Sequence, residues 1–146
     1  MAGVDFAKQQ DSVDSDRIAA IGYCFGGLCV LELARSGAAL SGVASFHGLL
    51  SKDPDTANET ITARIIAFHG WDDPFVPPDQ VREFTEEMSA ANADWQLHAY
   101  GNTLHSFTKP MANDPENGIA YNASAEQSSW QALTHFLREC FEPPAS

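Results

Sequence analysis

Residues 19–30 read AAIGYCFGGLCV, and this stretch decides the fold that we expect. An apolar run leads to Cys24, with Gly22 and Gly26 two positions before and after it, and a second apolar run follows. A buried cysteine ordinarily packs as a small hydrophobe and needs no such frame. Glycines on both sides indicate a turn so tight that a side chain at Gly22 or Gly26 would collide with its neighbours. The stretch therefore predicts a strand that turns sharply into a helix, with the cysteine at the turn.

Four segments have the patterns of strands. Three of them are almost continuously apolar, which is typical of parallel strands buried on both faces, and the fourth alternates apolar with polar residues. They cover residues 18–23, 42–47, 64–69 and 95–100. We expect the strands to pair in this order, which leaves the strand before Cys24 at an edge of the sheet.

Helical patterns lie between and after these strands, at residues 25–35, at residues 79–91 and in the stretch that follows Ser124. The spacing of Ser124 and Gln127 predicts a capping box at the start of the last helix. Strands that alternate with helices favour right-handed crossovers and helices on both faces of one sheet. The sequence therefore predicts a three-layer α/β fold with a mainly parallel sheet, formed by residues 1–146 as a single domain.

Composition narrows the class of partner. The formal net charge is −12 with only 8 lysines and arginines, which argues against nucleic acid and against anionic membrane surfaces. No apolar run approaches the ~20 residues of a membrane span. Cys24, Cys29 and Cys140 are an odd number of cysteines without the spacing of a disulfide framework. These features predict a cytoplasmic protein that binds neither nucleic acid nor membranes.

Reactive side chains follow three of the four predicted strands. Cys24 follows the first strand, Asp72 and Asp73 follow the third, and His105 follows the fourth. Because ligands of α/β sheets meet the carboxyl ends of the strands, we expect these side chains to converge. The order nucleophile, acid, histidine is that of hydrolases built on a strained strand-to-helix turn. In such a site the backbone N–H of Phe25 is the expected donor to a developing oxyanion.

The same segments carry a resemblance to a known family. The segments GYCFGG, HGWDDPFVP and LHSF, and the tail GIAYNASAEQSSWQALTHFLRECF, resemble the dienelactone hydrolase family of the α/β-hydrolase fold. The resemblance implies a cysteine-dependent hydrolase of small lactones or esters that uses neither a metal nor an organic cofactor. By motif it implies Cys24 as the nucleophile, Asp73 as the acid and His105 as the base. Asp72, one position earlier, is interpreted as part of the turn.

The chain departs from the family pattern in two ways. Family members usually extend further at the amino end, so residues 1–146 are expected to hold the C-terminal half of the family domain. The resemblance implies that the other half would supply more of the sheet, a second oxyanion N–H and a glutamate that assists the cysteine. Four positions after the histidine, some members carry an arginine that binds a substrate carboxylate, and this chain has Lys109 there. Lys109 is therefore the expected substrate-binding residue, for an anionic lactone or ester.

Two further interpretations stay open. His47 and His69 lie in nearly identical contexts, SFHG and AFHG, and with Asp72 or Asp73 they are candidates for a metal site. The alternative for both histidines is a structural role, at the floor of the pocket or in holding a loop. The alternative to a hydrolase is a catalytically impaired fragment or pseudo-enzyme that acts as an interaction module. Its apolar sheet edge would then pair with a second copy, so we expect a homodimer or aggregation.

Overall fold

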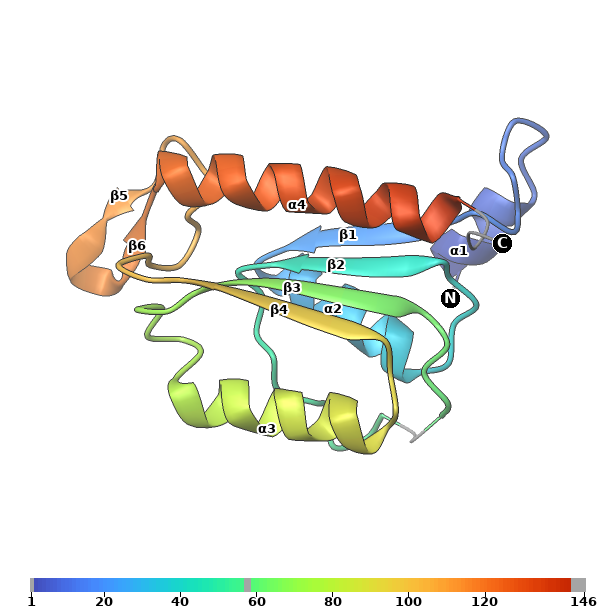
Figure 1. Ribbon diagram of the computed structural model, residues 1–146, viewed down its shortest axis with the longest axis horizontal. Coiled ribbons are helices and arrows are strands. Elements are labelled where there is room, and N and C mark those ends of the chain that lie inside the picture. The colour runs from blue at the N-terminus through green and yellow to red at the C-terminus, as the bar shows by residue number, and fades with distance from the viewer. Residues whose placement is uncertain (1, 57–58, 143–146) are drawn as a thin grey trace.

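A parallel sheet forms the centre of the molecule. The computed structural model describes residues 2–56 and 59–142, which Figure 1 shows as a ribbon. The strands are β1 (Ala19–Tyr23), β2 (Gly42–Phe46), β3 (Arg64–Gly70) and β4 (Trp95–Tyr100). They pair in parallel in the order β1-β2-β3-β4. The predicted order, with the strand before Cys24 at an edge, is confirmed, and every predicted strand boundary lies within one residue of the observed one.

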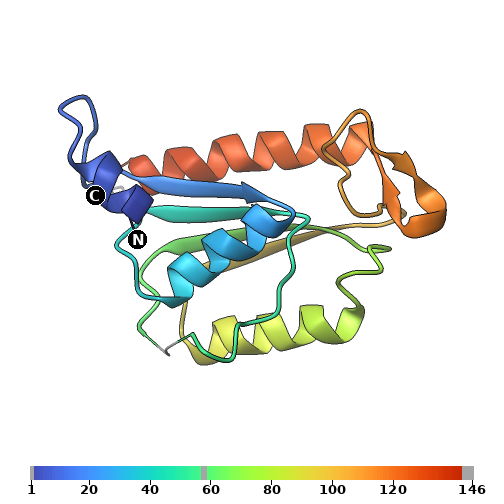
Figure 2. The ribbon, with the colours of Figure 1, turned by 180° about the vertical axis from the view of Figure 1, so that it is seen from behind.

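Helices cover both faces of this sheet (Figures 1 and 2). Helices α2 (Phe25–Arg35) and α3 (Pro78–Ala90) lie on one face, and α4 (Ala123–Phe141) lies on the other. Neighbouring side chains of β2 enter different cores, since Val43 packs with residues of α2 and α3 while Ala44 packs with residues of α4. Alternate side chains of a strand point to opposite faces, so this division follows from the pleat. The predicted three-layer α/β fold is confirmed.

The predicted start of the last helix is wrong in detail. Helix α4 begins at Ala123, and its N-cap is Asn122, whose side-chain oxygen accepts a hydrogen bond of 3.1 Å from the N–H of Ala125. Ser124 therefore lies inside the first turn and does not close the expected capping box. Asparagine is as good an N-cap as serine, and here it gains a second bond, from its Nδ2 to Thr103 Oγ1 at 2.9 Å.

Short elements at the amino end and before α4 complete the fold. Helix α1 (Ala2–Lys8) precedes β1, and Val4 packs against the core under α2 and α3. Between β4 and α4 the chain forms an antiparallel pair, β5 (Asn113–Asp114) and β6 (Ile119–Ala120), joined by the 3₁₀ helix η1 (Pro115–Asn117). No pattern in the sequence predicted this hairpin, because strands of two residues carry no periodicity. It supports His105, which pairs with Ile119 in an isolated bridge.

Strand β1 differs from its neighbours in exposure. Every residue of β2 is buried, whereas Ile21 and Tyr23 of β1 are 42% and 44% exposed. Among the described residues β1 pairs only with β2, so its outer edge carries backbone groups without a strand partner.

Within residues 2–56 and 59–142 no helix combines the length and the apolar character that crossing a membrane requires.

Candidate active site

Cys24 occupies a strained turn between β1 and α2. Its backbone angles are φ 52° and ψ −122°, a combination that L-residues rarely adopt, with a conformational free-energy cost of about 1–3 kcal/mol. The N–H of Cys24 donates to Phe46 O at 3.0 Å, and its carbonyl accepts from the N–H of Gly27 at 2.9 Å. These bonds tie the turn to the end of β2 on one side and to the first turn of α2 on the other.

The two glycines that frame the cysteine have different roles. A Cβ at Gly22 would lie 2.0 Å from Gly26 O, so the close approach of β1 to the start of α2 requires glycine there. A Cβ at Gly26 would meet no described atom within 4 Å, so the expectation that Gly26 is needed for space is wrong. The close contact belongs to Gly27, where a Cβ would lie 2.6 Å from Ser45 Oγ. The sequence pattern had assigned the second contact to the wrong glycine.

Phe25 is the first residue of α2, directly after the cysteine. The first N–H groups of a helix have no acceptor within the helix, and the positive end of the helix dipole lies at the same place. The N–H of Phe25 therefore lies at a position suited to an anion beside the Cys24 sulfur. The ring of Phe25 is 72% exposed and plays no part in the cores.

Asp73 and His105 form a hydrogen-bonded pair at the ends of β3 and β4. The Oδ2 of Asp73 lies 2.7 Å from Nδ1 of His105, and its Oδ1 accepts the N–H of Phe75 at 2.9 Å. The Asp73 side chain is fully buried, while that of His105 is 15% exposed. Asp72 is exposed and contributes its backbone N–H to Thr103 O at 3.0 Å. Of the two neighbouring aspartates, only Asp73 reaches the histidine.

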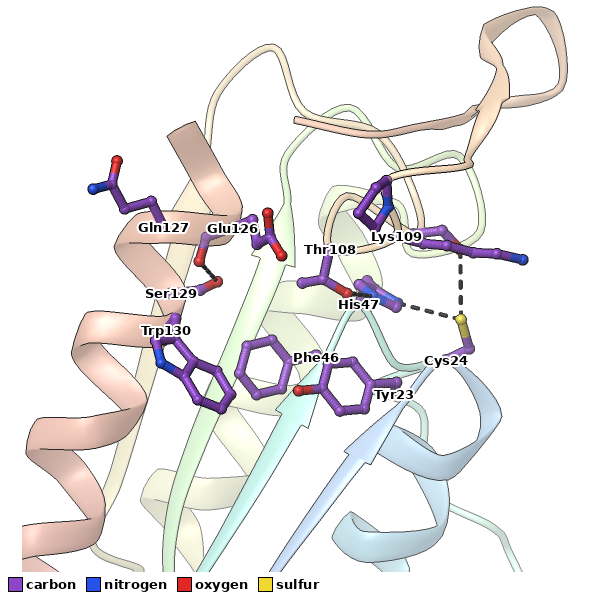
Figure 3. Close-up of a pocket in the computed structure, with 12 residues that line it drawn as sticks. Tyr23, Cys24, Phe46, His47, Thr108, Lys109, Glu126, Gln127, Ser129 and Trp130 are labelled. Carbon is purple, nitrogen blue, oxygen red and sulfur yellow. Dashed lines mark hydrogen bonds between the residues drawn. The ribbon is translucent and has the colours of Figure 1, made fainter. Parts of the chain in front are cut away.

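The Cys24 sulfur lies closest to a histidine that sequence reasoning had not assigned to it. The Sγ atom lies 3.3 Å from His47 Nδ1, a contact that Figure 3 marks with a dashed line, and 3.5 Å from Ser106 Oγ. One ligand atom from each of Cys24, His47 and His105 lies within 4.8 Å of the other two. Two imidazoles thus stand beside one thiol, and the sulfur bonds to the one without a carboxylate partner.

His47 is buried and fixed in place. It follows the last residue of β2 with φ 38°, and its Nε2 lies 2.8 Å from Thr108 Oγ1. Its ring meets that of His105 edge to face, with centroids 5.3 Å apart. Burial, followed by the charge that His105 can carry, lowers the pKa of His47 to about 4, so the ring is neutral near pH 7. The structural role expected for His47 is confirmed in that it lines the pocket and holds the loop at Thr108.

His69 has a different environment. It is 2% exposed, and both of its ring nitrogens lack a hydrogen-bond partner among the described residues. Burial lowers its pKa below the usual value of 6.5. The metal site of His47, His69 and an aspartate, left open by the sequence, is not formed. The one group of three metal-ligating side chains in the described residues is Cys24, His47 and His105.

A pocket of about 740 Å³ opens beside the cysteine, between the end of β1 and α4 (Figure 3). Aromatic side chains form much of its wall, those of Tyr23, Phe46 and Trp130. Lys109 and Glu126 bring opposite charges to it, so the predicted Lys109 lies at the pocket together with a carboxylate that the sequence did not reveal. Such a pocket has the size of small-molecule sites.

A second cavity of about 430 Å³ continues between β1 and α4 beyond this pocket. Ile21 of β1 and Leu133 and Leu137 of α4 line it. Trp130, which is 59% exposed, lines both cavities. The apolar surface beside β1 is therefore continuous with the wall of the pocket.

Comparison with known proteins gives one family. The sequence profile of the Dienelactone hydrolase family matches residues 1–141. An uncharacterized protein of Caenorhabditis elegans is 37% identical over 143 residues, which are 96% of this chain and 90% of that protein. The probable 2-oxo-3-(5-oxofuran-2-ylidene)propanoate lactonase of Bradyrhizobium is 30% identical over 146 residues, 94% of this chain and 56% of that protein.

Solved structures give the same result. The crystal structure of a dienelactone hydrolase-like promiscuous phosphotriesterase from metagenomic libraries superimposes with a TM-score of 0.86 at 39% sequence identity. The match covers 97% of this chain and 59% of that one. The chain thus spans little more than half of the lactonase and of this solved relative, but nearly all of the nematode protein.

Proposed function

The chain belongs to the dienelactone hydrolase family, and from this premise we propose that it is a cysteine-dependent hydrolase of small lactones or esters. One observation carries the proposal. A cysteine in a strained turn stands at one strand end, and a buried Asp73–His105 pair with a 2.7 Å bond stands at two neighbouring strand ends. The three residues occur in the order of a nucleophile, an acid and a base, which is the arrangement of nucleophilic acyl transfer.

In the proposed reaction the Cys24 sulfur attacks the acyl carbon, and His105 accepts the thiol proton. The carbonyl electron pair moves to oxygen, where the N–H of Phe25 stabilises the negative charge. Asp73 holds the imidazole in the tautomer whose Nε2 accepts the proton. As the tetrahedral intermediate collapses, the proton passes from His105 to the leaving alcohol and a thioester remains. Water that gives its proton to His105 then hydrolyses the thioester and restores the thiol.

The contact between Cys24 and His47 suits the resting state of this enzyme. A neutral imidazole, bonded through its other nitrogen to Thr108, keeps the sulfur beside the pocket. His105 offers its ligand atom within 4.8 Å of the sulfur, so in the proposed reaction the sulfur exchanges its contact with His47 for one with His105. We assign the proton transfer to His105 because only this ring is bound to a carboxylate.

The pocket supports a small, partly apolar substrate. Its aromatic wall suits a lactone or ester ring, and Lys109 would bind a carboxylate of an anionic substrate. A lysine offers a single mobile charge rather than the planar fork of an arginine, so selectivity for carboxylates is expected to be modest. The substrate in the name of the Bradyrhizobium relative, 2-oxo-3-(5-oxofuran-2-ylidene)propanoate, is an unsaturated five-membered lactone with a carboxylate and therefore an anionic lactone. The free thiols of Cys24, Cys29 and Cys140 suit the reducing compartment of the cytoplasm, where we place the protein.

The test uses the 146-residue chain with nitrophenyl acetate as an activated ester. We expect Cys24→Ala to abolish ester turnover and to abolish the acetyl group that intact mass spectrometry detects on the chain. Cys29→Ala, at an exposed cysteine of the same helix, is the matched control and should leave both unchanged. Undiminished turnover and acetylation in Cys24→Ala would contradict the proposal. The panel also includes a phosphotriester, since one structural relative is described as a promiscuous phosphotriesterase.

A second candidate function has its own observation, the open edge of β1. With Ile21 and Tyr23 about two-fifths exposed and a continuous apolar groove beside α4, this edge suits pairing with a second copy of the chain. In that case we expect a homodimer or aggregates, and ester turnover about 10² to 10³ below that of a site with two oxyanion donors. Light scattering during size-exclusion chromatography measures the mass. A monodisperse monomer would rule out the interaction module.

A further inference from the structure

Three side chains around the turn have the composition of a metal site. One atom from each of Cys24, His47 and His105 lies within 4.8 Å of the other two, and the sulfur lies 3.3 Å from His47 Nδ1. Around a tetrahedral zinc ion with bonds of about 2.0–2.3 Å, ligand atoms stand about 3.4–3.6 Å apart. We propose that these three side chains bind one divalent cation of zinc-like chemistry, and that the bound ion blocks the Cys24 thiol.

The second nitrogen of each imidazole already has a partner. His105 Nδ1 is bonded to the buried Asp73 carboxylate at 2.7 Å, and His47 Nε2 lies 2.8 Å from Thr108 Oγ1. This leaves Nε2 of His105 and Nδ1 of His47 for the ion. Histidines that bind zinc almost always carry such a partner on the other nitrogen, most often a carboxylate or a carbonyl. The hydrogen-bond partners that orient the histidines of a zinc site, Asp73 and Thr108, are therefore present here.

The coordination leaves one position open. Two imidazoles and one thiolate supply three of four tetrahedral ligands, and the fourth can be a water from the pocket that Cys24 and His47 line. As the ion binds, the S–H bond breaks, a sulfur–metal bond forms and the proton leaves to solvent, with no change of oxidation state. The formal net charge of −12 raises the local concentration of cations.

The effect on the thiol follows from the same bonds. A sulfur bound to a metal shares an electron pair with the ion, so it is a weaker nucleophile toward an acyl carbon or an alkylating agent than the free thiolate. The ion also takes the His105 nitrogen that accepts the proton in the proposed reaction. The inhibitory part of the inference rests on the proposed function, whereas binding and protection of the thiol do not.

Binding is tested with Co²⁺, whose bond to sulfur absorbs in the near ultraviolet, and with Zn²⁺ in a calorimetric titration of the 146-residue chain. We expect one equivalent to bind, and the sulfur–cobalt absorption to be lost in Cys24→Ser. His47→Gln should weaken Zn²⁺ binding at least tenfold, and Thr108→Val, which removes only the outer partner, about tenfold. Cys29→Ser and the exposed His135→Gln are controls that should leave affinity unchanged. Binding that survives Cys24→Ser with unaltered affinity would overturn the site.

Protection of the thiol is measured without relying on hydrolysis. One equivalent of Zn²⁺ should slow the alkylation of Cys24 by iodoacetamide at least tenfold while Cys29 reacts as before, and a chelator should restore the rate. Ester turnover, measured in parallel, should fall with the same occupancy. If turnover is absent altogether, the proposed hydrolase fails while the metal site stands on binding and alkylation. A rise of turnover with bound Zn²⁺ would overturn the inhibitory role.

Discussion

The ends of β2 and β3 carry almost the same peptide and use it differently. Residues 45–48 read SFHG and residues 67–70 read AFHG. Strand β2 stops at Phe46, so His47 turns out of the sheet with φ 38° and reaches the Cys24 sulfur. Strand β3 continues through Gly70, so His69 stays in register opposite Ala99 and meets no hydrogen-bond partner among the described residues. Whether each imidazole reaches the Cys24 sulfur or stays buried in the sheet depends on where its strand ends.

Gly48 and Gly70, the last residues of the two segments, both allow another part of the backbone to pack closely. A Cβ at Gly48 would lie 2.9 Å from the Cα of Gly27, in the first turn of the helix that follows Cys24. A Cβ at Gly70 would lie 2.5 Å from Thr103 O, in the segment that leads to His105. Each glycine thus lets a backbone carrying one reactive residue approach the sheet. Both segments therefore allow close packing of the backbone through their glycines. Only SFHG also supplies a residue of the site, His47.

The largest effect is expected at Asp73, which follows β3. His69, at the end of that strand, has no hydrogen-bond partner among the described residues, and it is Asp73 that bonds to His105. Asp73→Asn should lower ester turnover by about 10³ to 10⁴, because the imidazole of His105 is then held in the wrong tautomer. Asp72→Asn, at an exposed side chain one position earlier, is the matched control and should cost little. Steady-state kinetics on nitrophenyl acetate measure both. Equal losses in the two variants would show that the assignment of the acid is off by one residue.

A smaller effect is expected at the two glycines. Gly48→Ala and Gly70→Ala should each lower the free energy of unfolding by about 1–3 kcal/mol, since the new methyl group displaces packed backbone. Gly101→Ala is the control, because a Cβ there meets nothing within 4 Å. Urea denaturation at neutral pH gives the three values. If only one of the two glycines is sensitive, the segments do not share the packing role that their likeness indicates.

The smallest effect is expected at His69. Burial lowers its pKa, so on acidification below about pH 6.5 the unfolded chain takes up a proton that the folded chain does not, and the free energy of unfolding falls. His69→Leu removes this uptake and two unpaired buried nitrogens. It should raise stability by about 1 kcal/mol and make its decline toward acid pH shallower. Urea denaturation at a neutral and a mildly acidic pH measures both. A variant that is less stable at both would show that the imidazole has a partner.

The sequence predicted the framework of this protein well and the contacts of its site only in part. Apolar runs mark the strands of a parallel sheet, so the bounds of the strands followed from the periodicity of the sequence. The pairing of Asp73 with His105 follows from two strand ends that are neighbours in the sheet. The contact of His47 with Cys24 did not follow, because nothing in SFHG and AFHG says which strand stops first. Gly26 was misjudged since a frame of glycines does not show which of them faces a neighbour.

Because Trp130 lines both cavities, its fluorescence can report on what occupies either of them. The chain has three tryptophans, and Trp130 is the one that lines both the pocket beside Cys24 and the groove along β1. Its indole is more than half exposed, so its emission lies at long wavelength until something covers it. A small molecule in the pocket and a chain laid along β1 would both shift that emission toward the blue, and only the second would do so in proportion to protein concentration. With Trp71 and Trp95 replaced by phenylalanine, the fluorescence of one residue would tell a bound substrate from a docked partner.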